Sequence, residues 1–230
     1  MRPAIRPARW FPAVGLSFLL LASAAAAAPT FTVNSTFDAP GADTMGATLT
    51  DGVCETQHGN GICTLRAAIM EANHVPGGGA AIRLPPGTYA IGMGPVGAGS
   101  ERDGSFDLLA PMTIIGEGPS VSIVDGNNLD QVFDVSGDPV VLQGIGVRRG
   151  LLAGFTTGSG IVNTGNLTLE NVALVENGDA GDSSRGIRNL GTVSIRQSVI
   201  QGNFSFFANG GGSRTSEPHR CGLAHHGQCL

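Results

Sequence analysis

The chain has 230 residues, of which 36 are Gly and 13 are Pro, and only 13% are charged, whereas soluble domains average about 7% Gly and about 25% charged residues. The basic residues are 13 Arg with no Lys, and the formal net charge of −5 argues against a nucleic-acid-binding surface. A mean hydropathy of +0.14 argues against a disordered chain, and the abundant Gly argues against long helices. This composition favours short apolar strands separated by many tight turns.

Residues 1–28 have the pattern of a secretory signal peptide. Three Arg precede an apolar run over Phe11–Ala24, and Ala26 and Ala28 supply the small residues that signal peptidase recognises. A retained N-terminal anchor is the alternative, but the run is Ala-rich, marginal in length for a bilayer and not followed by stop-transfer charges. Cleavage would leave an acidic chain of net charge −8. We therefore expect a secreted or cell-surface protein with no membrane span after signal removal and no nucleic-acid partner.

The four Cys fit an exported protein, because disulfides persist in oxidising compartments. Cys54 and Cys63 bracket a short polar segment, and Cys221 and Cys229 form a second local pair. Four Cys allow three connectivities, and we expect the two local pairs. A metal site is the alternative for the second pair, because three His lie beside it, His219, His225 and His226. The Cys spacing is wider than is usual for zinc ligands, so we expect neither a metal nor a cofactor.

One segment, Leu65–Ala72, has helical rather than strand periodicity. Its apolar residues fall at i, i+3, i+4 and i+7, namely Leu65, Ala68, Ile69 and Ala72. Thr64 is suited to cap the N-terminus of this helix, and Asn73 together with the Pro and Gly that follow it ends the helix. The next segment, residues 81–91, has the pattern of a strand, a turn and a second strand. Further strands are predicted over residues 112–116, 121–124, 132–135 and 140–147.

Polar residues near these strands are the candidates for chemistry. A glycoside hydrolase needs two carboxylates about 5–9.5 Å apart, and a lyase needs a base, often Arg or Lys, with acidic calcium ligands. The weak candidate polar site consists of Asp125, Asp134, Arg148 and Arg149, with further acids at Asp103, Asp107, Asp130 and Asp138. No two of these carboxylates are expected to stack on one strand face, and Asp125 with the Gly-Asn-Asn that follows it resembles a turn. No catalytic residue is therefore assigned.

An internal repeat indicates the architecture. Residues 160–171 align with residues 186–197, which lie 26 positions later, and apolar residues alternate within each copy. Asn163 and Asn177 recur 26 positions later as Asn189 and Asn203. These Asn residues either stack their side chains from coil to coil or occupy isolated turns. One such repeat fits one coil of three short strands, and it contains no helix-forming half. The sequence predicts an all-β, right-handed parallel β-helix over residues 93–207, whose open first coil would be covered by the helix.

Residues beyond 207 leave the repeat register. Residues 208–230 are expected to form an irregular tail, which we interpret as a truncated or altered end of a longer β-helix.

The helix and its flanks resemble the CSLREA domain of bacterial exported proteins. The motif is present as Cys63-Thr64-Leu65-Arg66-Ala67-Ala68, followed by Ile69 and Asn73, and the resemblance covers residues 29–92 as an N-terminal cap region. Thr64 replaces Ser and preserves capping, whereas Ala67 replaces Glu and removes the reciprocal half of the capping box. The family implies a secreted or surface β-helix protein with no particular enzyme activity. We expect a non-catalytic adhesion, structural or glycan-contact role toward extracellular polysaccharide or the cell surface, with a β-helix polysaccharide lyase or glycoside hydrolase as the alternative.

Overall fold

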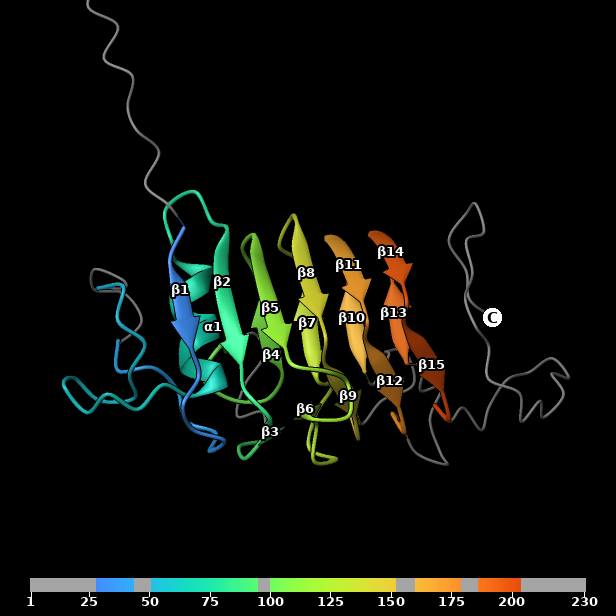
Figure 1. The fold of residues 1–230 in the computed structure, drawn as a ribbon, viewed down its shortest axis with the longest axis horizontal. Coiled ribbons are helices and arrows are strands. Elements are labelled where there is room, and N and C mark those ends of the chain that lie inside the picture. Colours follow the sequence, from blue (N-terminus) through green and yellow to red (C-terminus); the bar gives the residue numbers. More distant parts are fainter. Residues whose placement is uncertain (1–27, 44–50, 95–99, 152–159, 179–185, 204–230) are drawn as a thin grey trace, which may run out of the picture.

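A computed structural model describes residues 28–43, 51–94, 100–151, 160–178 and 186–203, and these residues form a parallel β-helix (Figure 1). All strand pairs among the described residues are parallel, and the strands form three sheets that run along the solenoid. Sheet A contains β1 (Thr30–Thr32), β2 (Ala80–Leu84), β5 (Met112–Gly116), β8 (Val140–Gln143), β11 (Asn166–Glu170) and β14 (Thr192–Arg196). Sheet B contains β3 (Gly87–Ala90), β6 (Ser122–Asp125), β9 (Gly146–Arg148), β12 (Ala173–Val175) and β15 (Val199–Gln201). Sheet C contains β4 (Phe106–Leu108), β7 (Phe133–Val135), β10 (Ile161–Asn163) and β13 (Ile187–Asn189).

The predicted repeat is the step from one coil to the next. Ile161 pairs with Ile187, Leu167 with Val193 and Leu174 with Ile200, so all three strands of that coil keep the 26-residue register. Earlier coils are slightly longer, since Val140 pairs with Leu167 and Met112 with Val140. The prediction of a parallel β-helix is confirmed, and most of the predicted strands between residues 81 and 135 are present with small shifts of their ends. The single strand predicted over residues 140–147 is instead two strands, β8 in sheet A and β9 in sheet B, separated by a turn.

Alternate residues of each strand fill a narrow core. In sheet A, one continuous interior row is buried and runs through Ile82, Ile114, Leu142 and Leu169. In sheet C, the buried rings of Phe106 and Phe133 lie 6.0 Å apart. Residues that alternate with these point outward, as the strand period of two requires. Function in the coils therefore depends on the outward-facing residues and on the turns.

Gly and Asn occupy positions where neighbouring coils approach closely. A Cβ atom at Gly165 would collide with the backbone carbonyl oxygens of Gly137 and Ser136 in the preceding coil, and Gly191 faces Gly165 in the same way. Asn163 donates from Nδ2 to Oδ1 of Asn189 over 2.6 Å, and Asn177 donates to Oδ1 of Asn203 over 3.0 Å. The Asn residues are therefore stacked from coil to coil rather than placed in isolated turns.

Helix α1 (Leu65–Asn73) lies at the N-terminal end of the solenoid, against β2 and β4. Thr64 accepts a hydrogen bond from the Ala67 N–H at 3.1 Å, which confirms it as the N-cap. The predicted apolar face belongs to the buried core and consists of Leu65, Ala68, Ile69 and Ala72. The helix thus covers the first coil, as the sequence predicted.

One of the two predicted disulfides lies within the described residues. Cys54 and Cys63 are joined by an S–S bond. Cys221 and Cys229, the tail over residues 208–230 and nearly all of the predicted signal over residues 1–28 lie outside the described residues. In the part of the chain that is described, no helix is long and apolar enough to cross a membrane.

Candidate functional site

Three of the four residues of the predicted polar site meet at the end of sheet B. Asp125 ends β6, and Arg148 is its register partner at the end of β9. Arg148 Nε donates to Asp125 Oδ2 at 2.8 Å, and Arg149 binds the same carboxylate through Nε at 2.8 and 2.9 Å and through Nη2 at 2.7 Å. Arg149 reaches it from a left-handed backbone conformation with φ of 50°. Two guanidinium groups therefore share one fully buried carboxylate.

The electrostatics of this cluster are those of an ion pair held between coils. Burial acts to raise the pKa of Asp125, but hydrogen bonds from Arg149, from the Asn127 N–H and from Arg148 outweigh it and lower the pKa below its usual value. The bond from Asn127 closes the turn that the sequence predicted after Asp125. The pKa of Arg149 is raised, mainly by its hydrogen bond to Asp125. An ionised carboxylate already bound by two guanidinium groups is a poor general base, and both guanidinium groups are occupied by it.

Asp134 does not join this cluster, because β7 belongs to sheet C. There it pairs in register with Asp107 of β4, 27 residues earlier, and the two side chains occupy the outward-facing position of adjacent strands. The expectation that no two carboxylates stack on one strand face is therefore wrong. The sequence pattern did not reveal the pair, because it predicted no strand over β4 and because the 27-residue step from β4 to β7 differs from the 26-residue period of the later coils.

The surroundings of Asp107 and Asp134 favour their protonated forms. Burial raises the pKa of Asp107 to about 6, and the nearby charges of Asp134 and Glu101 add to this rise, whereas a hydrogen bond from the Ser105 hydroxyl opposes it. Burial also raises the pKa of Asp134, against a hydrogen bond from Gln131. We call Asp107 and Asp134 the sheet C pair. Strands in a sheet lie about 4.8 Å apart, close to the carboxylate separation of about 5–5.5 Å in retaining glycosidases.

The sheet C pair is bordered by residues with structural bonds. Asp130 is buried and accepts hydrogen bonds from the backbone N–H groups of Ser105 and Gln131, both at 2.9 Å or less. Asn73, the last residue of α1, donates to Glu101 Oε2 at 3.0 Å and to the Asp107 carbonyl oxygen at 2.8 Å. Along sheet C the outward-facing row continues from Asp134 to Val162 and then to Arg188. The acidic part of the row is therefore confined to the two coils nearest α1.

Arg66 of the CSLREA-like motif has a structural role that the sequence did not specify. Its side chain is buried and forms a two-bond ion pair with Asp38, from Nε to Oδ1 at 2.8 Å and from Nη2 to Oδ2 at 3.1 Å. The remaining N–H groups donate to the carbonyl oxygens of Glu101, Ser105 and Gly104. The guanidinium also lies 4.7 Å from the ring centroid of Phe106. All five donors are satisfied, and the contacts join the N-terminal segment, α1 and the loop before β4.

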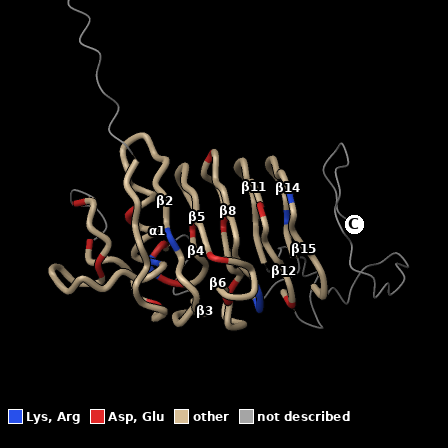
Figure 2. The backbone as a smooth tube through the Cα atoms, in the orientation of Figure 1, with Lys and Arg blue, Asp and Glu red and all other residues tan. Residues whose placement is uncertain are grey.

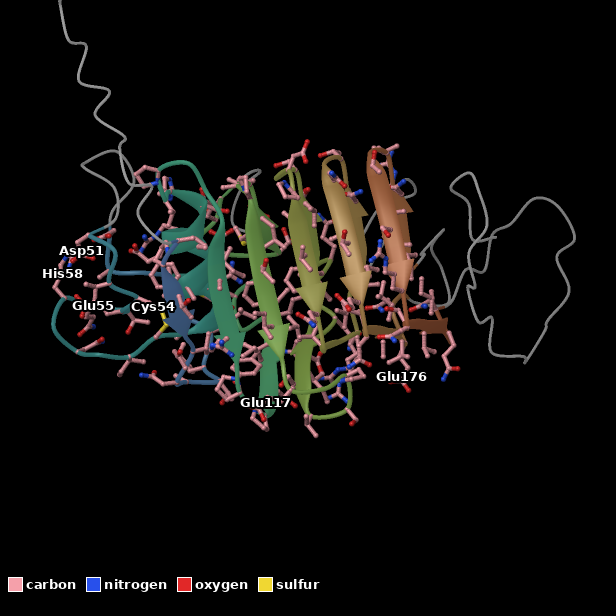
Figure 3. All side chains as sticks on the ribbon, turned by 45° about the horizontal axis from the view of Figure 1, so that its top comes forward. Asp51, Cys54, Glu55, His58, Glu117 and Glu176 are labelled. Atoms are coloured by element: carbon pink, nitrogen blue, oxygen red, sulfur yellow. A yellow bond between two sulfur atoms is a disulfide. The ribbon has the colours of Figure 1, made fainter. Side chains whose placement is uncertain are left out.

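The cap carries a second group of acids that the sequence analysis did not single out. Acidic residues gather in the loop outside β1 and β2 (Figure 2), and Asp51, Glu55 and His58 lie together there beside Cys54 (Figure 3). Two sets of three residues have ligand atoms close enough to share an ion. The first set is Asp51, Glu55 and His58, and the second is Asp43, Asp51 and Glu71. The pKa of Glu71 is raised to about 8. Burial is the largest cause, followed by a hydrogen bond with Asp43 and by electrostatic repulsion from Asp43 and Asp51. The sequence offered little signal, because these residues are separated by turns and a helix.

Comparison with known proteins found no matching family model, no matching curated protein and no matching solved structure. The class of protein is therefore defined by the fold, which is that of a parallel β-helix protein with an N-terminal helical cap.

Proposed function

We propose that this chain is an exported, non-catalytic β-helix protein that contacts extracellular polysaccharide or the cell surface. The observation that carries this proposal is the engagement of Arg148 and Arg149, the two candidate bases, with a single buried carboxylate, Asp125. These groups hold adjacent coils together and contribute little to proton transfer. A rigid solenoid of this kind presents long rows of outward-facing side chains, which suits adhesion or structural roles.

Export and membership of the CSLREA family are part of the proposal. The Arg-rich, apolar and small-residue pattern of residues 1–28 supports export. The buried contacts of Thr64 and Arg66 give a physical reason for a motif of this kind in the cap. The test is to express the tagged full chain and a variant lacking residues 1–28 in a bacterial host and to fractionate the cells. The full chain should leave the cytoplasm and the shortened chain should remain in it, and equal distribution of the two would contradict export.

Contact with polysaccharide is assigned to the sheet C pair. Partly exposed carboxylates on a flat strand face accept hydrogen bonds from sugar hydroxyls, and Arg188 lies farther along the same row. The test is binding of the purified chain to a panel of neutral and acidic polysaccharides by affinity electrophoresis. Asp134→Asn should weaken binding, whereas Glu117→Gln, which alters an exposed acid after β5, should not. Binding that is the same in all three proteins would rule out this surface.

A carbohydrate-cleaving activity is the second candidate, and the sheet C pair is the observation that favours it. Asp107, with its pKa raised to about 6, is able to hold a proton for a leaving glycosidic oxygen. Asp134 would then have to be ionised to act as nucleophile or base, but burial raises its pKa as well, so the two pKa values shift in the same direction rather than apart as in an acid–base pair. The test is release of reducing ends or unsaturated products from the same panel, between about pH 4 and pH 8, with and without calcium. Turnover that is abolished by Asp107→Asn and retained by Glu117→Gln would establish an enzyme and overturn the non-catalytic proposal.

A further inference from the structure

The acids of the cap converge from three separate places in the chain. Asp43 follows the N-terminal segment, Asp51 precedes the disulfide loop, and Glu71 lies in the last turn of α1. One carboxylate oxygen of each lies within 4.8 Å of the others. Calcium–oxygen distances are about 2.3–2.6 Å, so three oxygens spaced in this way are able to contact one ion at the same time.

Two carboxylate oxygens of this cluster are buried and have no N–H or O–H donor. Glu71 is only 4% exposed, and neither its Oε2 nor Oδ2 of Asp43 accepts a hydrogen bond from an N–H or O–H donor of another residue. The hydrogen bond with Asp43 that raises the pKa of Glu71 therefore forms only when the two carboxyl groups share a proton. Leaving such acceptors unsatisfied in a buried site is costly. The end of α1 adds to the negative potential, because its last turn contains no basic residue. Among the described residues no Arg forms an ion pair with any of the three acids.

We propose that Asp43, Asp51 and Glu71 bind one Ca²⁺ ion. All three donors are carboxylate oxygens, which hard cations such as calcium prefer. The ion would neutralise the two unpartnered oxygens and would join the loop after Asp51 to α1. Water fills the remaining coordination positions, as is usual for calcium. The proposal concerns the cap alone and does not depend on the proposed contact with polysaccharide.

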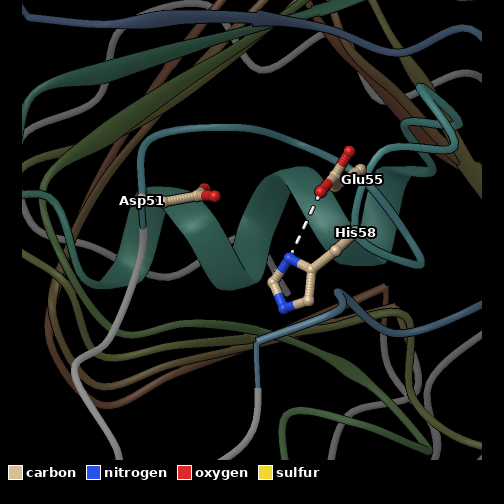
Figure 4. Close-up of side chains that lie close together, drawn as sticks. All are labelled: Asp51, Glu55 and His58. Carbon is tan, nitrogen blue, oxygen red and sulfur yellow. Dashed lines mark ion pairs between the residues drawn. The ribbon is translucent and has the colours of Figure 1, made fainter.

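The neighbouring set with His58 is not the site that we propose. Glu55 Oε2 already accepts a hydrogen bond from the Gly59 N–H at 2.8 Å, and Oε1 lies 3.3 Å from His58 Nδ1 (Figure 4). Glu55 and His58 therefore pair within the loop, and His58 Nε2 also lies 3.7 Å from Asp43 Oδ1. Asp51, on the opposite side of the view in Figure 4, belongs to both sets. This difference makes Glu55 a suitable control, because it is an acid of the same cap that we place outside the calcium site.

The test is the melting temperature of the purified full chain at about pH 8, first with a chelator and then with rising CaCl₂ up to about 10 mM. Extracellular calcium modules bind with dissociation constants of about 10⁻⁴–10⁻³ M. At about 10 mM such a site raises the melting temperature of a domain of this size by about 3–10 °C, and above the dissociation constant the shift grows with the logarithm of the calcium concentration. Glu71→Gln and Asp51→Asn should each abolish the shift, whereas Glu55→Gln should retain it. Asp51 is exposed, so Asp51→Asn tests the site even if Glu71→Gln does not fold.

Three outcomes would overturn the proposal. The first is a wild-type chain whose melting temperature does not respond to CaCl₂. The second is a response that Asp51→Asn retains. The third is a melting temperature that responds to ZnCl₂ but not to CaCl₂, with a response that His58→Ala abolishes. That result would assign a zinc site to the other set, Asp51, Glu55 and His58.

Discussion

The cap and the coils of this β-helix are stabilised in different ways. In the coils, the same contact recurs once per turn, as in the interior row of sheet A and the Asn163–Asn189 bond. In the cap, each strong contact occurs once and joins residues far apart in the chain, such as Asp38 with Arg66 and Cys54 with Cys63. The repeat spreads stability over many equivalent positions, whereas the cap concentrates it in a few side chains. A single substitution should therefore be more damaging in the cap than in the coils.

Arg66→Met provides the strongest test of this difference. The substitution keeps much of the side-chain volume but leaves the Asp38 carboxylate, whose side chain is 2% exposed, buried without its partner. Breaking a buried ion pair in this way costs about 3–5 kcal/mol, and three backbone carbonyl oxygens lose their donor as well. The free energy of unfolding should be measured by urea titration, with Arg83→Met as control, because Arg83 lies on the exposed face of β2. A loss no larger than that of the control would show that the cap does not depend on this contact.

Gly165→Ala should have the largest effect among substitutions in the coils. The added methyl group would meet the backbone carbonyls of Gly137 and Ser136, which are parts of the neighbouring coil and cannot rotate away. We expect a loss of about 2–4 kcal/mol, as for other steric overpacking against a rigid neighbour. Gly94→Ala is the control, since no atom lies within 4 Å of its added methyl group. Equal melting temperatures for the two variants would contradict the close approach of the coils.

Asn177→Ala should remove one rung of the Asn stack. Asn177 is buried, accepts a hydrogen bond from the Gly150 N–H at 3.0 Å and donates to the carbonyl oxygen of Val147 at 3.1 Å. Its loss leaves buried backbone groups unpaired, at an expected cost of about 1–3 kcal/mol. Asn166→Ala, at an exposed position of β11, should cost less than about 0.5 kcal/mol. Hydrogen exchange at Gly150 should also become faster in Asn177→Ala and remain unchanged in Asn166→Ala.

The same contrast explains what the sequence alone could predict. The 26-residue register, the Asn stack and the apolar face of α1 were predictable, because each follows from a local period. Asp107 and Asp134 were missed because the earlier coils differ in length, so their pairing does not appear at the period of the later repeats. The partners of Arg66 and Glu71 were not predictable, because no periodic pattern relates them to Asp38 or Asp43. Periodicity predicts contacts between coils, whereas the cap depends on chain paths that only the folded structure defines.

Asp107→Asn should have the smallest effect and the opposite sign. The pKa of Asp107 is about 6 in the folded chain, whereas an unfolded Asp has a pKa near 4. The folded state therefore holds the proton more tightly, and its stability falls as the pH rises from about 4 to about 6. Above about pH 6 the substitution should stabilise the fold by about 1–2 kcal/mol, because Asn cannot ionise and still accepts the hydrogen bond from Ser105. Below about pH 4 the two proteins should unfold alike, so urea titrations across this range check the prediction. Glu117→Gln removes an acid from an exposed turn and should show no such pH-dependent gain. A difference in stability between Asp107→Asn and wild type that does not vary with pH would show that folding does not raise the pKa of Asp107.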